Sequence, residues 1–283
     1  MAFGNPATRK FMKVPISDLR EHCGRSEFGV VGFGYDPVDD DHKFLRMIHY
    51  YGRDGHLLNS QVKVYSLKSN TWKRVGDFPF KGVHRGIGVL VGSSLHWMMG
   101  IQLPDFSTSC LALAFDLVTE KYRRIPFPDK KIAQDKNFFT TMTELGGWLC
   151  ELTKYRAGDT DWVDHVDIWV MKQYGVKESW VKLFSVVPSD MTGVFNDAMP
   201  LAYLKNTHQV LVDLDGGKIM LFDLEMNKAK SARKISDCPQ CFNTSISVGS
   251  LVGFGGRDGD NDRKMAEENG DKEEKQEQSG EKR

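Results

Sequence analysis

Two cysteines, Cys238 and Cys241, form a CxxC motif, a spacing that can bind zinc or carry thiol–disulfide exchange. A structural zinc site needs four ligands, which usually come as two such pairs, and the sequence has no second pair. A thioredoxin-like site needs the motif after a strand and at the start of a helix, whereas strand-forming sequence surrounds it here. We therefore interpret the motif as a loop with two ordinary thiols.

The other residue types that can do chemistry are dispersed. The segment Gly82–Gly88 lacks the GK[ST] ending of a phosphate-binding loop, and Asp39–Asp41 with His42 lacks the spacing of a calcium loop, which favours a solvated hairpin turn. No HExxH or GxSxG motif occurs, and His96 lies in a predicted strand, where a satisfied, partly buried histidine is the simpler interpretation. The sequence thus predicts no catalytic residue, no metal site and no cofactor, so we do not expect an enzyme.

One segment could recognise a partner. Asp159–His165 is an acidic insertion that carries a tryptophan and lies between two predicted strands. Polar loops with an exposed tryptophan are typical of recognition surfaces. Asp161, Trp162 and His165 are accordingly the candidate partner-binding residues. The alternative is an ordinary connection between two strands.

The elements that would position such a surface follow from a repeated phrase. An apolar strand with a central aromatic residue, a short polar turn and a second aromatic strand recur along the chain. The aromatic anchors are Tyr65, Phe115, Trp169 and Phe222, at intervals of 50, 54 and 53 residues. A fixed period of this size indicates a fold of stacked four-stranded units.

Each repeat also predicts a second kind of hairpin, in which two apolar segments flank a turn. The predicted pairs are 28–35 with 44–51, 85–91 with 95–99, 141–145 with 148–152, and 208–213 with 218–223. Adding the aromatic hairpin gives about four strands in fifty residues. We therefore predict an all-β, kelch-like, propeller-type domain of four-stranded antiparallel units. A two-sheet sandwich, which gives similar strand spacing, is the alternative.

The end of the chain has a different composition. Residues 257–283 hold ten acidic and seven basic residues, with Met265 and Ala266 as the only hydrophobic ones. Such a segment cannot offset its ordering entropy by burial. We predict a β domain over residues 1–254 and a disordered, charged tail over residues 255–283.

The composition limits which partners the chain could bind and in which cellular compartment it would function. The 38 basic and 38 acidic residues cancel, so no global field draws the chain to nucleic acid or to an anionic membrane. No apolar run approaches the roughly 20 residues that cross a bilayer, and the first residues do not resemble a secretion signal. The five scattered cysteines do not form a disulfide framework. A cytoplasmic or nuclear location is expected.

Several long motifs resemble the F-box-associated domain of plant F-box proteins, a group that includes F-box/kelch-repeat and S-locus-type F-box proteins. The family phrase close to WNPxTRxFxxLP is similar to Asn5–Pro15, and GFGYDxxxDDYKVxR is similar to Gly32–Arg46. Further family phrases match segments 64–73, 95–97, 114–128, 144–152 and 167–184 in the same order. The resemblance spans roughly residues 5–254.

The resemblance implies the substrate-recognition half of an SCF-type E3 ubiquitin ligase receptor. In that family an N-terminal F-box binds the ligase adaptor and cullin, the β domain holds the target protein, and other subunits transfer ubiquitin. The helical F-box is not found in this sequence, so adaptor and cullin are expected only with a product that contains one. A glycan-binding domain or an enzyme on a propeller scaffold are the alternatives.

The family also places strands before its first phrase. This chain begins at the turn Asn5–Thr8, so we expect the preceding strand to be absent and the domain to be incomplete at its N-terminus. An incomplete ring would leave unpaired backbone groups on the partner strand.

Overall fold

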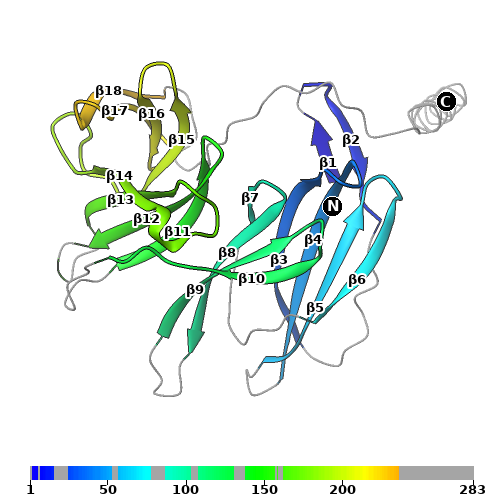
Figure 1. Ribbon diagram of the computed structural model, residues 1–283. Coiled ribbons are helices and arrows are strands. Elements are labelled where there is room, and N and C mark those ends of the chain that lie inside the picture. Colours follow the sequence, from blue (N-terminus) through cyan, green and yellow to red (C-terminus); the bar gives the residue numbers. More distant parts are fainter. Residues whose placement is uncertain are drawn as a thin grey trace, which may run out of the picture. The chain divides into compact units, whose positions relative to one another are not determined.

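The computed structural model describes residues 2–5, 7–15, 25–52, 57–77, 87–102, 108–130, 138–156, 158 and 162–235 (Figure 1). Within these residues the strands form four antiparallel sheets of four strands each and one two-stranded hairpin. The helical content of the same residues is one short 3-10 turn, η1 (Lys177–Ser179), and no helix among them is long and apolar enough to cross a membrane. The predicted all-β class and four-stranded antiparallel units are confirmed.

In every four-stranded sheet the strands pair in chain order, so each sheet is built from one continuous stretch of sequence. The first sheet holds β3 (Arg25–Asp36), β4 (Asp41–Tyr51), β5 (Leu57–Ser66) and β6 (Thr71–Asp77); the second holds β7 (Val89–Val91), β8 (Ser94–Gln102), β9 (Thr108–Asp116) and β10 (Lys121–Ile125). The third holds β11 (Phe138–Leu145), β12 (Trp148–Arg156), β13 (Val163–Met171) and β14 (Trp180–Val186); the fourth holds β15 (Ala198–Leu204), β16 (Gln209–Leu214), β17 (Lys218–Asp223) and β18 (Lys228–Lys234).

The four aromatic anchors occupy the same place in each sheet. Tyr65, Phe115, Trp169 and Phe222 lie on β5, β9, β13 and β17, which are the third strands of their sheets. A third strand has hydrogen-bonded neighbours on both sides, which is why a large aromatic side chain can be buried there. Tyr65 and Phe115 are fully buried, and Phe222 is 4% exposed. The period of the sequence is therefore the period of the sheets.

Four of the turns share one pattern of hydrogen bonds. Asn5, Asp36, Asp116 and Asp223 each end a strand, and each Oδ1 accepts hydrogen bonds of 2.8–3.3 Å from the backbone N–H groups two and three residues later. The residue four positions after each of them has a φ of 49–56°; these residues are Arg9, Asp40, Glu120 and Asn227. The side chain closes the turn, and the left-handed residue returns the chain to antiparallel pairing.

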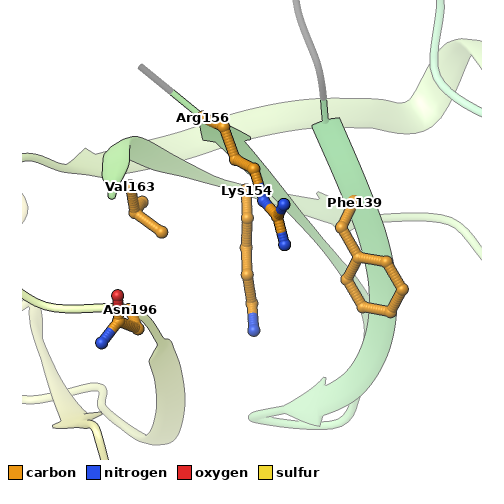
Figure 2. Close-up of a pocket in the computed structure, with 5 residues that line it drawn as sticks. All are labelled: Phe139, Lys154, Arg156, Val163 and Asn196. Carbon is orange, nitrogen blue, oxygen red and sulfur yellow. The ribbon is translucent and has the colours of Figure 1, made fainter. Parts of the chain in front are cut away.

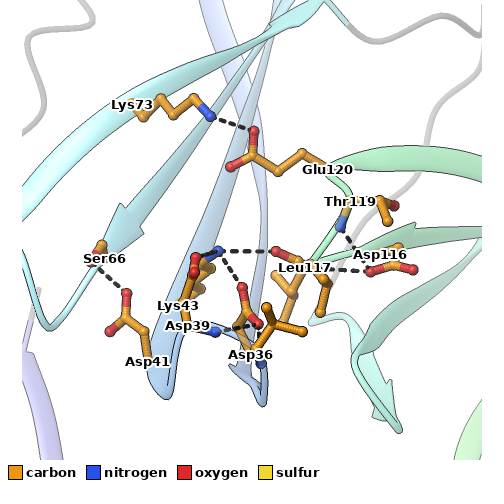
Figure 3. A network of polar contacts seen from close by, with 12 residues as sticks. Asp36, Asp39, Asp41, Lys43, Ser66, Lys73, Asp116, Leu117, Thr119 and Glu120 are labelled. Carbon is orange, nitrogen blue, oxygen red and sulfur yellow. Dashed lines mark hydrogen bonds and ion pairs between the residues drawn. The ribbon is translucent and has the colours of Figure 1, made fainter.

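The turn between β3 and β4 is tied to the second sheet by a buried lysine (Figure 3). Lys43 Nζ lies 2.5 Å from Asp36 Oδ2 and 3.2 Å from Asp39 Oδ2. It also donates a hydrogen bond of 3.1 Å to the carbonyl oxygen of Leu117, in the turn after β9. The acidic run 39–41 lies at the β3–β4 hairpin turn, as predicted; Asp39 and Asp40 are exposed to solvent there, whereas Asp41 is buried.

Apolar side chains fill the space between neighbouring sheets, in chain order. One core joins the first and second sheets through residues such as Leu45 and Leu95, a second joins the second and third through Ala112 and Leu149, and a third joins the third and fourth through Ile168 and Val212. Four sheets stacked in sequence agree with the propeller-type prediction and not with the two-sheet sandwich.

The two-stranded hairpin belongs to a compact unit separate from the four sheets. It pairs β1 (Ala2–Asn5) with β2 (Lys10–Lys13), in the register Ala2 opposite Lys13. The expectation that no strand precedes the turn at Asn5 is therefore wrong. Four residues suffice because the Asn5 side chain fixes the turn and with it the register.

Other predictions fall on residues that the structure does not describe. The CxxC motif at 238–241, the domain boundary at 254 and the charged tail over 255–283 all lie outside the described ranges. Most of the Gly-rich segment 82–88 does so as well. All four stay predictions.

The third sheet has the β11–β12 and β13–β14 connections at one end and the β12–β13 connection at the other. β11 and β12 are joined by Gly146-Gly147, whose φ values of 63° and 92° suit a tight hairpin turn that glycine adopts readily. The β12–β13 connection, the chain that enters β11 and the chain that leaves β14 lie at the other end, because the strands are antiparallel. Trp162, from the acidic insertion predicted above, directly precedes β13 at this end, which we call the insertion end.

Candidate partner-binding site

A pocket of about 410 Å³ opens at the insertion end of the third sheet (Figure 2). Its lining residues are Phe139, Lys154, Arg156, Val163 and Asn196. Figure 2 shows the Lys154 and Arg156 side chains reaching into the space between Phe139 on one side and Val163 and Asn196 on the other. A volume of this size lies within the range of roughly 300–1,000 Å³ that is usual for ligand pockets.

Strand register brings four of these side chains together. Phe139 on β11 is paired with Lys154 on β12, and Arg156 is paired with Val163 at the start of β13. Lys154 and Arg156 are two positions apart on one strand, so their side chains leave the same face. The register shifts between Tyr155 and Arg156, which adjusts the pairing where β13 begins.

The fifth residue comes from the chain that leads into β15. The Asp215 carboxylate accepts hydrogen bonds from the backbone N–H groups of Asn196, at 2.8 Å, and Asp197, at 2.7 Å. Asp215 lies in the β16–β17 turn with a φ of 56°. The wall of the pocket formed by Asn196 is therefore anchored to the fourth sheet.

The charged side chains that line the pocket are basic. Its five lining residues include two cations and no anion. Lys154 Nζ lies 2.8 Å from Asp197 Oδ1, just outside the lining, and 5.8 Å from the centroid of the Phe139 ring. Phe139 is 61% exposed, so an apolar ring and two positive groups face a ligand that enters from solvent.

The three residues predicted from the sequence are placed differently. Trp162 directly precedes Val163 of the pocket and is 57% exposed. His165 lies on the other face of the sheet, where it stacks on Tyr155 with ring centroids 4.3 Å apart and its Nδ1 is 2.9 Å from Asp164 Oδ2. Asp161 is outside the described residues. The role of these three residues in binding stays a prediction.

The face of the sheet opposite the pocket holds a buried polar group. Lys130, in the chain that enters β11, pairs with the Glu151 carboxylate and the Thr153 hydroxyl on β12. Burial raises the pKa of Glu151 and lowers the pKa of Lys130. The ammonium also lies 5.7 Å from the Trp169 ring centroid. These contacts hold Lys130, which precedes β11 in the chain, against β12.

The pocket residues were not predicted from the sequence. Phe139, Lys154 and Arg156 have no motif, and Asn196 is distant in sequence. The available signal was the alternation of cations at Lys154 and Arg156 directly before the acidic insertion. Among the described residues no group of three or more His, Cys, Asp or Glu side chains could hold a metal ion.

Comparison with known proteins gives one family. A family model described as the F-box associated beta propeller domain matches residues 2–248. F-box protein CPR1 of Arabidopsis thaliana is 34% identical over 269 residues, which cover 89% of this chain and 63% of that protein. F-box protein At4g22390 of the same plant is 30% identical over 269 residues, which cover 89% of this chain and 64% of that protein.

The chain thus spans just under two thirds of the length of these curated relatives. Among solved structures, an α-L-arabinofuranosidase from Fusarium graminearum is similar at 10% identity, with a TM-score of 0.43 over 79% of this chain and 68% of that one. A likeness at this score carries no argument about activity.

Proposed function

Because this chain belongs to the F-box associated β-propeller family, we propose that it is the target-recognition module of an SCF-type ubiquitin ligase receptor. The observation that carries the proposal is the family match over residues 2–248. The names of the curated relatives, which are F-box proteins, support it. In this role the module holds a protein target, and an F-box elsewhere in the full-length product engages the adaptor and the cullin.

The third sheet offers a surface suited to that role. Its four strands form one antiparallel sheet, and β12 ends and β13 begins at the end of the sheet that carries the pocket. Exposed Phe139 and Trp162 lie there with Arg156, and aromatic residues and arginine are the types that dominate binding energy at protein interfaces. Such a module binds its target, and the other ligase subunits carry out the chemistry.

Affinity purification followed by mass spectrometry tests the proposal. The full-length gene product and this chain are each purified from the source tissue. We expect adaptor and cullin with the full-length product but not with this chain, and a shared set of target proteins with both. Recovery of neither adaptor nor cullin with the full-length product would contradict the proposal.

A further inference from the structure

The charge of the pocket points to the chemistry of its ligand. We infer that the pocket binds an acidic side chain of the target protein, with an apolar neighbour of that side chain packed on Phe139. This inference rests on the proposed function, since it names the kind of target segment that the module would hold. Its basis is the pairing of two cations with an exposed ring in one open pocket.

The two cations have complementary roles. Arg156 presents a planar guanidinium, which can hold a carboxylate through two parallel hydrogen bonds. Lys154 is a compact charge whose side chain is only 17% exposed, so it adds positive potential from the floor of the pocket. The pocket walls exclude part of the solvent, which strengthens the attraction relative to an open surface.

Asp197 acts as an internal competitor for the ligand. Its carboxylate already lies 2.8 Å from Lys154 Nζ, and its side chain is 43% exposed. The backbone N–H of Asp197 donates to Asp215, which holds this residue beside the pocket. An arriving carboxylate therefore meets a site whose positive charge is partly neutralised, and removing that carboxylate should strengthen binding.

The apolar part of the pocket defines the rest of the ligand. Phe139 offers an exposed ring, Val163 lines the opposite wall, and Trp162 is exposed directly beside Val163. An acidic residue that enters between them places its sequence neighbour against an apolar surface. A segment that alternates acidic and apolar residues satisfies both parts of the site.

Fluorescence polarisation with defined probes tests this inference on the full chain. The probes are a fluorescein-labelled hexapeptide of alternating glutamate and leucine, and the same peptide with glutamine in place of each glutamate. We expect the glutamate peptide to bind at least about tenfold more tightly, since hydrogen bonds to charged groups are among the strongest in proteins. Its affinity should fall as the salt concentration rises.

Three variants assign the effect to the pocket. Arg156→Gln should weaken binding of the glutamate peptide about tenfold. Asp197→Asn, nearly equal in shape, should strengthen it about threefold by removing the competing carboxylate. Lys205→Gln is the matched control, because it removes one exposed positive charge at the opposite end of β15 and should leave the affinity unchanged.

The higher peptide affinity expected for Asp197→Asn distinguishes an effect on binding from an effect on folding, because a damaged fold does not bind more tightly. Equal binding of the two peptides, binding of neither up to about 1 mM, or unchanged affinity in Arg156→Gln overturns the inference. Displacement of the peptide by chitotriose overturns it as well, in favour of a glycan site. In any of these cases, adaptor and cullin recovered with the full-length product would leave the receptor proposal standing.

Discussion

Single residues inside the sheets are held in one protonation state, and His96 is the clearest case. It is fully buried; its Nδ1 donates to the carbonyl oxygen of Val89 at 3.0 Å, and its Nε2 accepts from the Tyr174 hydroxyl at 2.6 Å. Burial lowers the pKa of His96 to about 4, and the positive charge of Arg123 acts in the same direction. The histidine is thus neutral in the fold. Its two hydrogen bonds confirm the prediction of a satisfied histidine, and its burial is complete where partial burial was predicted.

This geometry predicts a loss of stability at mildly acidic pH. Above pH 6.5 His96 is neutral in the folded and unfolded chain, so its contribution is constant. As the pH falls from 6.5 to 4 the unfolded chain takes up a proton that the folded chain does not, which lowers the free energy of unfolding by on the order of 3 kcal/mol. Urea unfolding at several pH values measures this.

Two variants, His96→Asn and His208→Asn, test whether His96 causes the pH dependence of the free energy of unfolding. His96→Asn should be less stable at pH 8 but flatter across the acidic window, because the titrating group is gone. His208 is 58% exposed in its side chain, and asparagine tolerates its φ of 50°, so His208→Asn serves as the control for replacing a histidine at the surface. An unchanged slope in His96→Asn would refute the assignment.

At the scale of elements, four of the turns that join the strands each depend on one side-chain oxygen. Asp116 Oδ1 accepts from the backbone N–H groups of Val118 at 2.8 Å and Thr119 at 3.2 Å (Figure 3). Asn5 makes the same two hydrogen bonds with an amide oxygen. The turn therefore needs an acceptor at this position and does not need a negative charge.

Replacing Asp116 separates these two properties. Asp116→Ala leaves two N–H groups without their acceptor and should lower the free energy of unfolding by about 1 kcal/mol. Asp116→Asn keeps the acceptor, as at Asn5, and should cost clearly less. Chemical denaturation of the two variants beside the original chain measures the difference. Equal losses in both variants would show that the charge of Asp116, and not the turn, is what stabilises this element.

The elements were easier to predict from the sequence than the site. Strands and hairpins follow from local alternation and turn chemistry, so the anchors at Tyr65 and Phe115 led directly to the sheets. The pocket depends on pairing across strands and on Asp215 fixing the chain at Asn196, which no local pattern contains. His165 was chosen for its loop, but the register places it on the opposite face.

At the scale of the four sheets, stability depends on how closely neighbours approach. The first and second sheets meet at Gly88, whose N–H donates to the carbonyl oxygen of Val31 on β3 at 2.7 Å. A Cβ at Gly88 would lie 2.6 Å from Cζ2 of the Trp97 indole. Trp97 belongs to the core that joins these two sheets and is 3% exposed, so its rigid ring has little room to move.

Gly88→Ala should therefore separate the two sheets locally and destabilise the fold. Overpacking of this kind costs typically about 1–3 kcal/mol, because the backbone or the indole must shift. Gly217→Ala is the matched control: a Cβ there meets nothing within 4 Å, so that variant should be neutral or slightly more stable. Urea unfolding monitored by tryptophan fluorescence compares the three chains. If Gly88→Ala unfolds at the same urea concentration as Gly217→Ala, the close approach at Trp97 does not limit the packing of the first two sheets.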